Sequence, residues 1–452
     1  MNYLISNRDL VKYFINWMDL KSLKTLCLVS KNVCKNVKTA LFSFKYKGTK
    51  RFFWINTKKI QNTDDIDQFH RNTVRNLLDY DDREIYKVFG NLQRLFVYES
   101  HSKNLVLPNT LINLSIMNYN HPLPILPPRL KTLNLGHLFN HFITKDMVPA
   151  TLEHVSIGTE YSHDITPLLS PGLKSLWFSS GYKLPIKYKV LPRNLEELYL
   201  PILSDKPLNY YDLPVHLKYL RMAGVDKIPV GSLSNNLTVL NIYRYSFELE
   251  IGTLPPTLKK LTMGNYPYDL KPNILPPSLK SLHMRNFKGK ILPNSIPPSV
   301  KSLVTSGNIG DPIVIPKTVT HLDLTWKLDE HITRQDFPSN IKILRVRMMG
   351  DRVIKKNQLP SVDELHISGV GSIEDGALDN TECKYLKLWG YRGVITDKTL
   401  PSSITRLMLG KNSILDMESF PPTLTYLMIH HDYEYELPPL TGINVSMSIL
   451  RY

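Results

Sequence analysis

Hydrophobic residues recur along most of the chain in one short pattern, L-P-x-x-L-x-x-L-x-L. Clear copies are LPNTLINLSI (107–116), LPPTLKKLTM (254–263), LPPSLKSLHM (275–284) and LPSSITRLML (400–409). In steps of 19 to 22 residues, the first core residue after the proline falls at 111, 130, 152, 173, 195, 217, 237, 258, 279, 300, 319, 341, 362, 383, 404 and 424. With a weak copy at 92–97 and a shortened one at 440–445, the pattern predicts 17 to 18 repeated units.

Each unit predicts one short strand, because its last two apolar residues alternate with polar ones. One such strand cannot bury its apolar face alone, but stacked neighbours build a continuous core. The rest of each unit, about 11 residues, is too short for a helical crossover, so we expect extended or single-turn 3₁₀ backbone there. The proline fits a coil corner, since it cannot donate to a sheet. We therefore expect a mainly β, right-handed solenoid of about 17–18 short coils, with a parallel sheet on its inner face.

The units resemble leucine-rich repeats, with one departure. In that family the eighth position after the first Leu carries an Asn whose amide bonds to the next coil. Asn occurs here only at 308 and 412, and we expect a ladder of mostly apolar side chains instead, formed by Tyr119, Leu138, Leu203, Val225, Tyr245, Tyr266, Phe287, Val370 and Tyr391.

Just beyond this position come segments similar to Phe-Asn-x-Pro-Ile. Examples are YNHPL (119–123), FNHFI (139–143) and YKLPI (182–186). Together with L-P-x-S-L-x-x-L, they resemble the FNIP repeat family, a leucine-rich-repeat-like group, over residues 88–445. The resemblance implies an interaction scaffold rather than an enzyme. FNIP arrays occur mainly in social amoebae and in giant viruses that infect amoebae.

The N-terminal residues predict two short helices. Leu10, Phe14 and Met18 form one helical stripe, and a second helix runs through Leu26 and Val29. By itself this hairpin fits a cap over the first coil of a solenoid. The order of its apolar residues also resembles the F-box. That resemblance implies an adaptor-binding surface for a cullin–RING ubiquitin ligase, made by Leu10, Phe14, Met18, Leu23, Leu26, Leu28 and Val29.

Four segments follow from these patterns. They are an F-box-like module at 1–45, a linker or capping segment at 46–87, the FNIP repeat solenoid at 88–445 and a C-terminal tail at 446–452.

The composition indicates a chain that can form a core and restricts the cellular compartment in which it can act. Hydrophobic residues make up 42% and charged residues 21%, so the chain can form a core. Three cysteines, an odd number, fit a reducing compartment, and we find neither a signal peptide nor a transmembrane stretch. We therefore expect a cytoplasmic protein, in the host cytoplasm if it is viral. The net charge is +16, and the first 50 residues hold ten Lys or Arg against two acids.

Motifs for catalysis and for cofactors are missing from the sequence. It contains no GxxxxGK[ST], GxGxxG after a strand, HExxH or GxSxG. The histidine pairs His137 with His141 and His430 with His431 lack a third ligand. We expect no enzyme, no cofactor and no metal.

Aromatic and arginine residues lie between the core leucines, on the predicted inner face. Such residues anchor many protein interfaces, although strands also use aromatics for cross-strand packing. The predicted partner-binding residues are Trp177, Tyr199, Tyr219, Arg221, Tyr243, His283, Arg285, Arg345, Arg347, Trp389 and Arg406.

Three functions remain open at this level. The first is a substrate receptor that holds the ligase adaptor through the F-box and a target protein on the solenoid. The second is a scaffold whose N-terminal helices only cap the coils. The third is nucleic-acid binding, suggested by the net charge. Nucleic acid is the less favoured partner, because acids interrupt the basic residues of the inner face. These acids are Glu153, Glu196, Glu197, Asp323 and Glu364.

Overall fold

The computed structural model forms two compact units, residues 1–195 and 196–452, which we describe separately. The structure describes residues 55–56, 76–79, 91–97, 105–184, 186, 188–202, 210–223, 227–306, 315–326, 333–433 and 435–448. The F-box-like module, with Leu10, Phe14, Met18, Leu23, Leu26, Leu28 and Val29, lies outside these residues.

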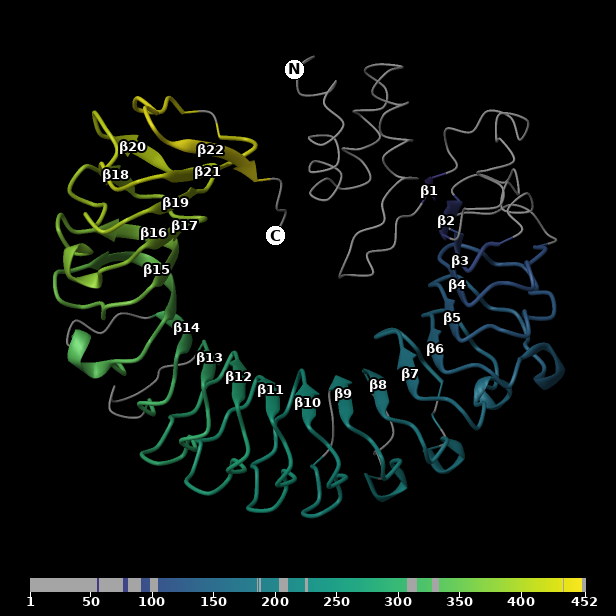
Figure 1. The fold of residues 1–452 in the computed structure, drawn as a ribbon. Helices are drawn as coiled ribbons and strands as arrows, with labels where there is room; N and C mark the ends of the chain where they lie inside the picture. The colour runs from purple at the N-terminus through teal and green to yellow at the C-terminus, as the bar shows by residue number, and fades with distance from the viewer. Residues whose placement is uncertain are drawn as a thin grey trace, which may run out of the picture. The chain divides into compact units, whose positions relative to one another are not determined.

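In the first unit, each coil adds one strand parallel to the strand before it (Figure 1). The strands are β1 (Ile55–Asn56), β2 (Asn76–Asp79), β3 (Arg94–Val97), β4 (Asn113–Ile116), β5 (Thr132–Leu135), β6 (His154–Ile157) and β7 (Ser175–Phe178). Single 3₁₀ turns lie on the return path, at Lys145–Met147, Thr166–Leu168 and Tyr188–Val190.

The second unit repeats this construction. Its parallel sheet contains β8 (Glu197–Ile202), β9 (Tyr219–Ala223), β10 (Val239–Ile242), β11 (Lys260–Gly264), β12 (Ser281–Arg285), β13 (Ser302–Thr305), β14 (His321–Trp326), β15 (Ile343–Ile354), β16 (Glu364–Ile373), β17 (Tyr385–Leu388), β19 (Arg406–Leu409), β21 (Tyr426–His430) and β22 (Asn444–Ser448). On the return path, β18 (Val394–Thr396) and β20 (Ile414–Asp416) form a second parallel pair, and 3₁₀ turns occur at Tyr210–Asp212, Arg334–Asp336 and Asp379–Thr381.

The core is built from the repeated leucines. Along β10, Leu240 and Ile242 are fully buried, whereas Val239 and Asn241 alternate with them on the other side of the sheet. The register pairs like positions of successive coils, so Leu240 lies beside Leu261. This confirms the predicted parallel solenoid with 3₁₀ turns on the return path. Within the described residues, no helix is long and apolar enough to cross a membrane.

The Pro-x-x-Leu step forms a turn that closes most of the coils. In one coil the backbone N–H of Leu258 donates to the carbonyl oxygen of Pro255 at 3.1 Å, and Leu279 does the same to Pro276. The Ser or Thr before the leucine donates its hydroxyl to the preceding coil: Ser278 Oγ lies 2.7 Å from the Leu258 carbonyl oxygen. A hydroxyl at this motif position therefore links one coil to the next.

In the second unit, the eighth position carries stacked aromatic rings. Tyr266 lies between Tyr245 and Phe287, with ring centroids 6.3 and 6.2 Å away. The hydroxyl of Tyr266 accepts the backbone N–H of Leu249 at 3.1 Å. These tyrosines therefore fill the core and also satisfy a buried donor of the preceding coil, as the amide does in leucine-rich repeats.

The predicted ladder is correct at Tyr119, Tyr245, Tyr266, Phe287 and Tyr391, all buried, but wrong at Leu138. Leu138 is 46% exposed, and the following Phe139 is buried in its place. This coil has one more residue between its last core leucine and the ring, which moves the ladder position to the ninth residue. Leu203, Val225 and the side chain of Val370 lie outside the described residues.

The first unit also keeps an amide ladder next to the rings. Asn120 Oδ1 accepts the backbone N–H of Asn140 at 3.0 Å, and Asn140 Oδ1 accepts that of Ser162 at 2.9 Å. The Asn of the Phe-Asn-x-Pro-Ile segment thus replaces the Asn that is missing one position earlier.

Candidate functional site

Side chains at the second, fourth and sixth positions after each first core residue lie on the side of the sheet away from the core. We call this side the sheet surface. Because the register pairs like positions, these side chains form columns across the strands, for example Arg221, Asn241 and Thr262. The partner-binding residues predicted for the repeats all occupy such positions.

Four of the predicted residues come together on β8 to β10 of the second unit. The guanidinium of Arg221 lies between two rings, 4.7 Å from the ring centroid of Tyr243 and 5.7 Å from that of Tyr199. Tyr199 stacks on Tyr219 at 4.7 Å, and Asn241 Nδ2 donates to the Tyr219 hydroxyl at 2.6 Å. We call these five residues the Tyr–Arg cluster.

The Tyr–Arg cluster has no counter-ion among the described residues. No carboxylate in the described residues forms an ion pair with Arg221. Burial, together with the hydroxyl of Tyr219, raises the pKa of Tyr199, which stays neutral. The buried Asn241 Oδ1 has no donor among the described residues. The cluster therefore offers a cation held between two partly exposed rings.

A second polar group lies on β15 to β17. Arg345 Nε donates to His366 Nδ1 at 3.3 Å, and His366 Nε2 contacts Glu364, which also accepts from Lys387 Nζ at 2.7 Å. An imidazole that accepts at Nδ1 carries its single proton at Nε2 and is neutral. Burial, with lesser help from the charges of Lys387 and Arg345, lowers the pKa of His366 to about 4, whereas Glu364 opposes the shift.

This depressed pKa makes stability depend on pH. The unfolded state protonates His366 at a higher pH than the folded state does. The contribution of neutral His366 to the free energy of unfolding is therefore fully present above about pH 6.5 and is lost as the pH drops toward 4. Between about pH 7 and pH 5, we expect the free energy of unfolding of the wild type to fall by about 1–2 kcal/mol more than that of His366→Gln. Urea unfolding at the two pH values measures this, and equal pH dependence in both proteins would contradict it.

The remaining predicted residues are spread over separate places. Arg285, Arg345 and Arg347 act together on Asp323, whose pKa is nevertheless raised, because burial outweighs the three positive charges. Trp389 contacts His430 with ring centroids 4.9 Å apart, and Arg406 is exposed on β19. Trp177 is 41% exposed on β7 of the first unit.

His283 lies on β12 beside a possible nucleophile. Its Nε2 lies 3.1 Å from Ser281 Oγ. A serine–histidine pair acts as a nucleophile when a third, anionic group orients the base. Here burial and then the positive charges of Lys260 and Arg285 lower the pKa of His283, and no described carboxylate bonds to it. The pair therefore lacks the anionic group of a catalytic triad.

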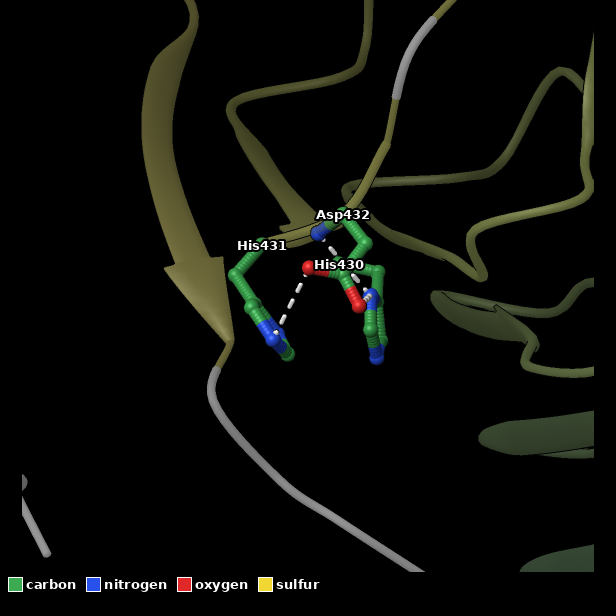
Figure 2. Close-up of side chains that lie close together, drawn as sticks. All are labelled: His430, His431 and Asp432. Carbon is green, nitrogen blue, oxygen red and sulfur yellow. Dashed lines mark hydrogen bonds and ion pairs between the residues drawn. The ribbon is translucent and has the colours of Figure 1, made fainter. Parts of the chain in front are cut away.

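The last residue of β21 and the turn after it gather three possible metal ligands (Figure 2), so Asp432 supplies a third group beside the two histidines noted in the sequence. The ligand atoms of His430, His431 and Asp432 lie within 4.8 Å of one another. However, His430 Nδ1 accepts the backbone N–H of Asp432 at 3.0 Å, so its lone pair is engaged and its other nitrogen carries the proton. His431 and Asp432 alone are too few protein ligands for a zinc site.

Sequence reasoning missed Asn241, Glu364, His366 and Lys387. All four occupy the second or fourth position of a coil, the same positions as the residues it selected. Comparing diagonal neighbours on adjacent strands would have found Glu364 and Lys387, because the second position of one coil and the fourth position of the next carry opposite charges.

Comparison with known proteins identifies the repeat. The FNIP Repeat model matches residues 119–160, 226–266 and 269–304, so the chain contains FNIP repeats in both units and is a leucine-rich-repeat-like solenoid. A comparison with curated proteins gives no match.

Among solved structures, the chain is similar to CroV588, described as a novel circular LRR protein structure. The two are 24% identical with a TM-score of 0.55; the match covers 83% of this chain and 58% of CroV588, so this chain spans less than two thirds of that protein. YopM from Yersinia enterocolitica is 17% identical over 79% of this chain and 87% of its own, with a TM-score of 0.33. InlJ from Listeria monocytogenes is 16% identical over 65% of this chain and 68% of its own, with a TM-score of 0.38.

Proposed function

We propose that this protein is a non-enzymatic scaffold that binds a partner protein on the sheet surface of its second unit. The Tyr–Arg cluster carries the proposal. Aromatic and arginine side chains supply most of the binding energy at protein interfaces, and here they are already held in place by stacking and by the contact between Tyr219 and Asn241. Little side-chain freedom is then lost on binding.

The cluster suits a protein partner for one further reason. Arg221 lies between rings with no paired carboxylate among the described residues, so a carboxylate or a backbone carbonyl of a partner can approach it.

The experiment removes the cluster from the full-length protein. Tyr199→Ala, Arg221→Ala and Tyr243→Ala are combined, and the matched control combines Tyr211→Ala, Tyr268→Ala and Arg392→Ala, which are exposed residues of the same types. Proteins that wild type and control retain from a cell lysate should be reduced at least about tenfold on the cluster variant. Equal retention by a variant with unchanged circular dichroism would refute the proposal.

We further propose that the scaffold is the substrate-recognition subunit of a cullin–RING ubiquitin ligase and acts in the cytoplasm. The support is the resemblance of residues 1–45 to the F-box. In this arrangement the N-terminal module holds the ligase adaptor and the sheet surface holds the target. Ubiquitin transfer then gains from effective concentration, with no chemistry on this chain.

A second pair of full-length proteins tests the ligase role. Wild type and a Leu10→Asp, Leu26→Asp double variant are compared for recovery of the adaptor and a cullin. Recovery by wild type alone supports the receptor. Recovery by neither protein assigns the predicted N-terminal helices to capping and leaves the scaffold function unaffected.

A further inference from the structure

Eight coils carry a lysine directly after their first core residue, and three of these lysines pair with a glutamate on an adjacent coil. In the first unit, Glu153 accepts from Lys131 at 2.7 Å on one side and from Lys174 at 2.9 Å on the other. In the second unit, Lys218 pairs with Glu196 at 3.0 Å. A lysine at this repeat position is therefore paired where an adjacent coil carries a glutamate at the same position.

Three consecutive coils carry a lysine here with no acid at this position on either adjacent coil. Lys259, Lys280 and Lys301 occupy the same position, and all three are exposed. Their backbones are directly bonded, since the Lys280 N–H donates to the Lys259 carbonyl oxygen at 2.8 Å and the Lys301 N–H to that of Lys280 at 2.9 Å. Thr238 and Thr320 occupy the position on the flanking coils. We call these three residues the lysine column.

No charge within the described residues compensates the lysine column. None of its members forms an ion pair there. Residues 252–306 contain eight Lys or Arg and a single acid, Asp269, whose Oδ1 accepts the backbone N–H of Lys290. Adjacent strands are about 4.8 Å apart, well within the screening length of about 8 Å at physiological salt. The like charges therefore repel one another in the free protein, and an anionic partner would relieve this repulsion.

We propose that the lysine column binds an acidic polypeptide segment that runs across the residues directly before β11, β12 and β13. This deepens the proposed function, since it assumes that the array binds protein and adds the chemistry of the partner. Every second side chain of an extended peptide faces the same way, about 6.7 Å apart. The flexible lysine stems can adjust to such a row of carboxylates.

The neighbouring surface favours a polypeptide over a nucleic acid. Proteins that bind single strands combine basic residues with aromatic rings on which the bases stack. In the coils that contain β11 to β13, the second and fourth positions after the first core residue carry no Phe, Tyr or Trp. These positions hold Lys260, Thr262, Ser281, His283, Ser302 and Val304.

The test measures binding of a labelled poly-glutamate peptide of about ten residues to the full-length protein by fluorescence anisotropy. One variant carries Lys259→Gln, Lys280→Gln and Lys301→Gln. The control carries Lys131→Gln, Lys174→Gln and Lys218→Gln, which removes the same charge from the same repeat position. Affinity should fall about tenfold in the column variant and stay within about twofold in the control.

Three outcomes would overturn the proposal: an equal loss in both variants, no loss in the column variant, or tighter binding of a thymidine oligonucleotide of equal charge that depends on the same lysines. The Tyr199, Arg221, Tyr243 variant separates the two proposals. One outcome is that the Tyr–Arg variant binds poly-glutamate normally but no longer retains partner proteins, while the column variant loses poly-glutamate binding but retains partner proteins. In that case the two surfaces act independently. If the column variant binds poly-glutamate normally while the Tyr–Arg variant loses its partners, only the lysine column is refuted.

Discussion

Replacing Tyr266 with alanine should lower the free energy of unfolding by about 3–5 kcal/mol. The ring is 2% exposed and lies between Tyr245 and Phe287. Truncation leaves a cavity that both neighbouring coils border, and the rigid stack limits its collapse. The hydroxyl is lost as well, which leaves the backbone N–H of Leu249 without its acceptor. Urea unfolding followed by circular dichroism gives the change.

Two variants divide this effect. Tyr266→Phe keeps the stack and removes only the hydroxyl, so it should cost about 1–2 kcal/mol. Tyr268→Ala removes a ring that is 40% exposed in the same coil and should cost less than about 1 kcal/mol. If Tyr268→Ala were as damaging as Tyr266→Ala, the stability would not reside in the buried stack.

Gly158→Ala should destabilise the first unit by about 3 kcal/mol or more, although it adds a single methyl group. A Cβ atom at residue 158 would lie 1.8 Å from the carbonyl oxygen of Gly136, on the preceding coil. That oxygen belongs to the backbone, so relief requires the two coils to move apart. Thermal unfolding of the full chain measures the effect.

Gly172 provides the matched control. A Cβ atom there would have its nearest neighbour, the Ala150 carbonyl oxygen, at 3.7 Å, which is ordinary contact. Gly172→Ala should therefore be neutral or slightly stabilising. A loss of stability at residue 172 equal to that at residue 158 would show that the coil spacing is not what selects glycine at 158.

The fold could be predicted because each unit repeats a simple physical requirement. Leucines at positions such as 258 and 261 must be buried, and proline at 255 must lie at a corner, whatever the neighbouring coils contain. The ladder was harder to place. Leu138 and Phe139 are both apolar, and only the length of the turn before them decides which one enters the core.

The site was predicted in composition but not in arrangement. Reading positions alone identified Arg221 and Tyr243, because exposed aromatic and arginine residues stand out at strand positions. It could not show that Arg221 lies between two rings, since that depends on side-chain torsions. It also missed His366, because one histidine becomes informative only when Arg345 and Glu364 are found on either side of it.

The hydroxyl link between coils bears on how such a chain can change length during evolution. Ser278 bonds to the carbonyl of Leu258, and Ser299 bonds to that of Leu279 in the same way. Every coil in this stretch therefore presents the same donor and acceptor to its neighbours. Loss of residues 275–295 would join two coils that still fit, with Ser299 facing Leu258 and Lys301 facing Lys259. Gain or loss of a whole repeat would thus lengthen or shorten the binding surface while each remaining column keeps its register.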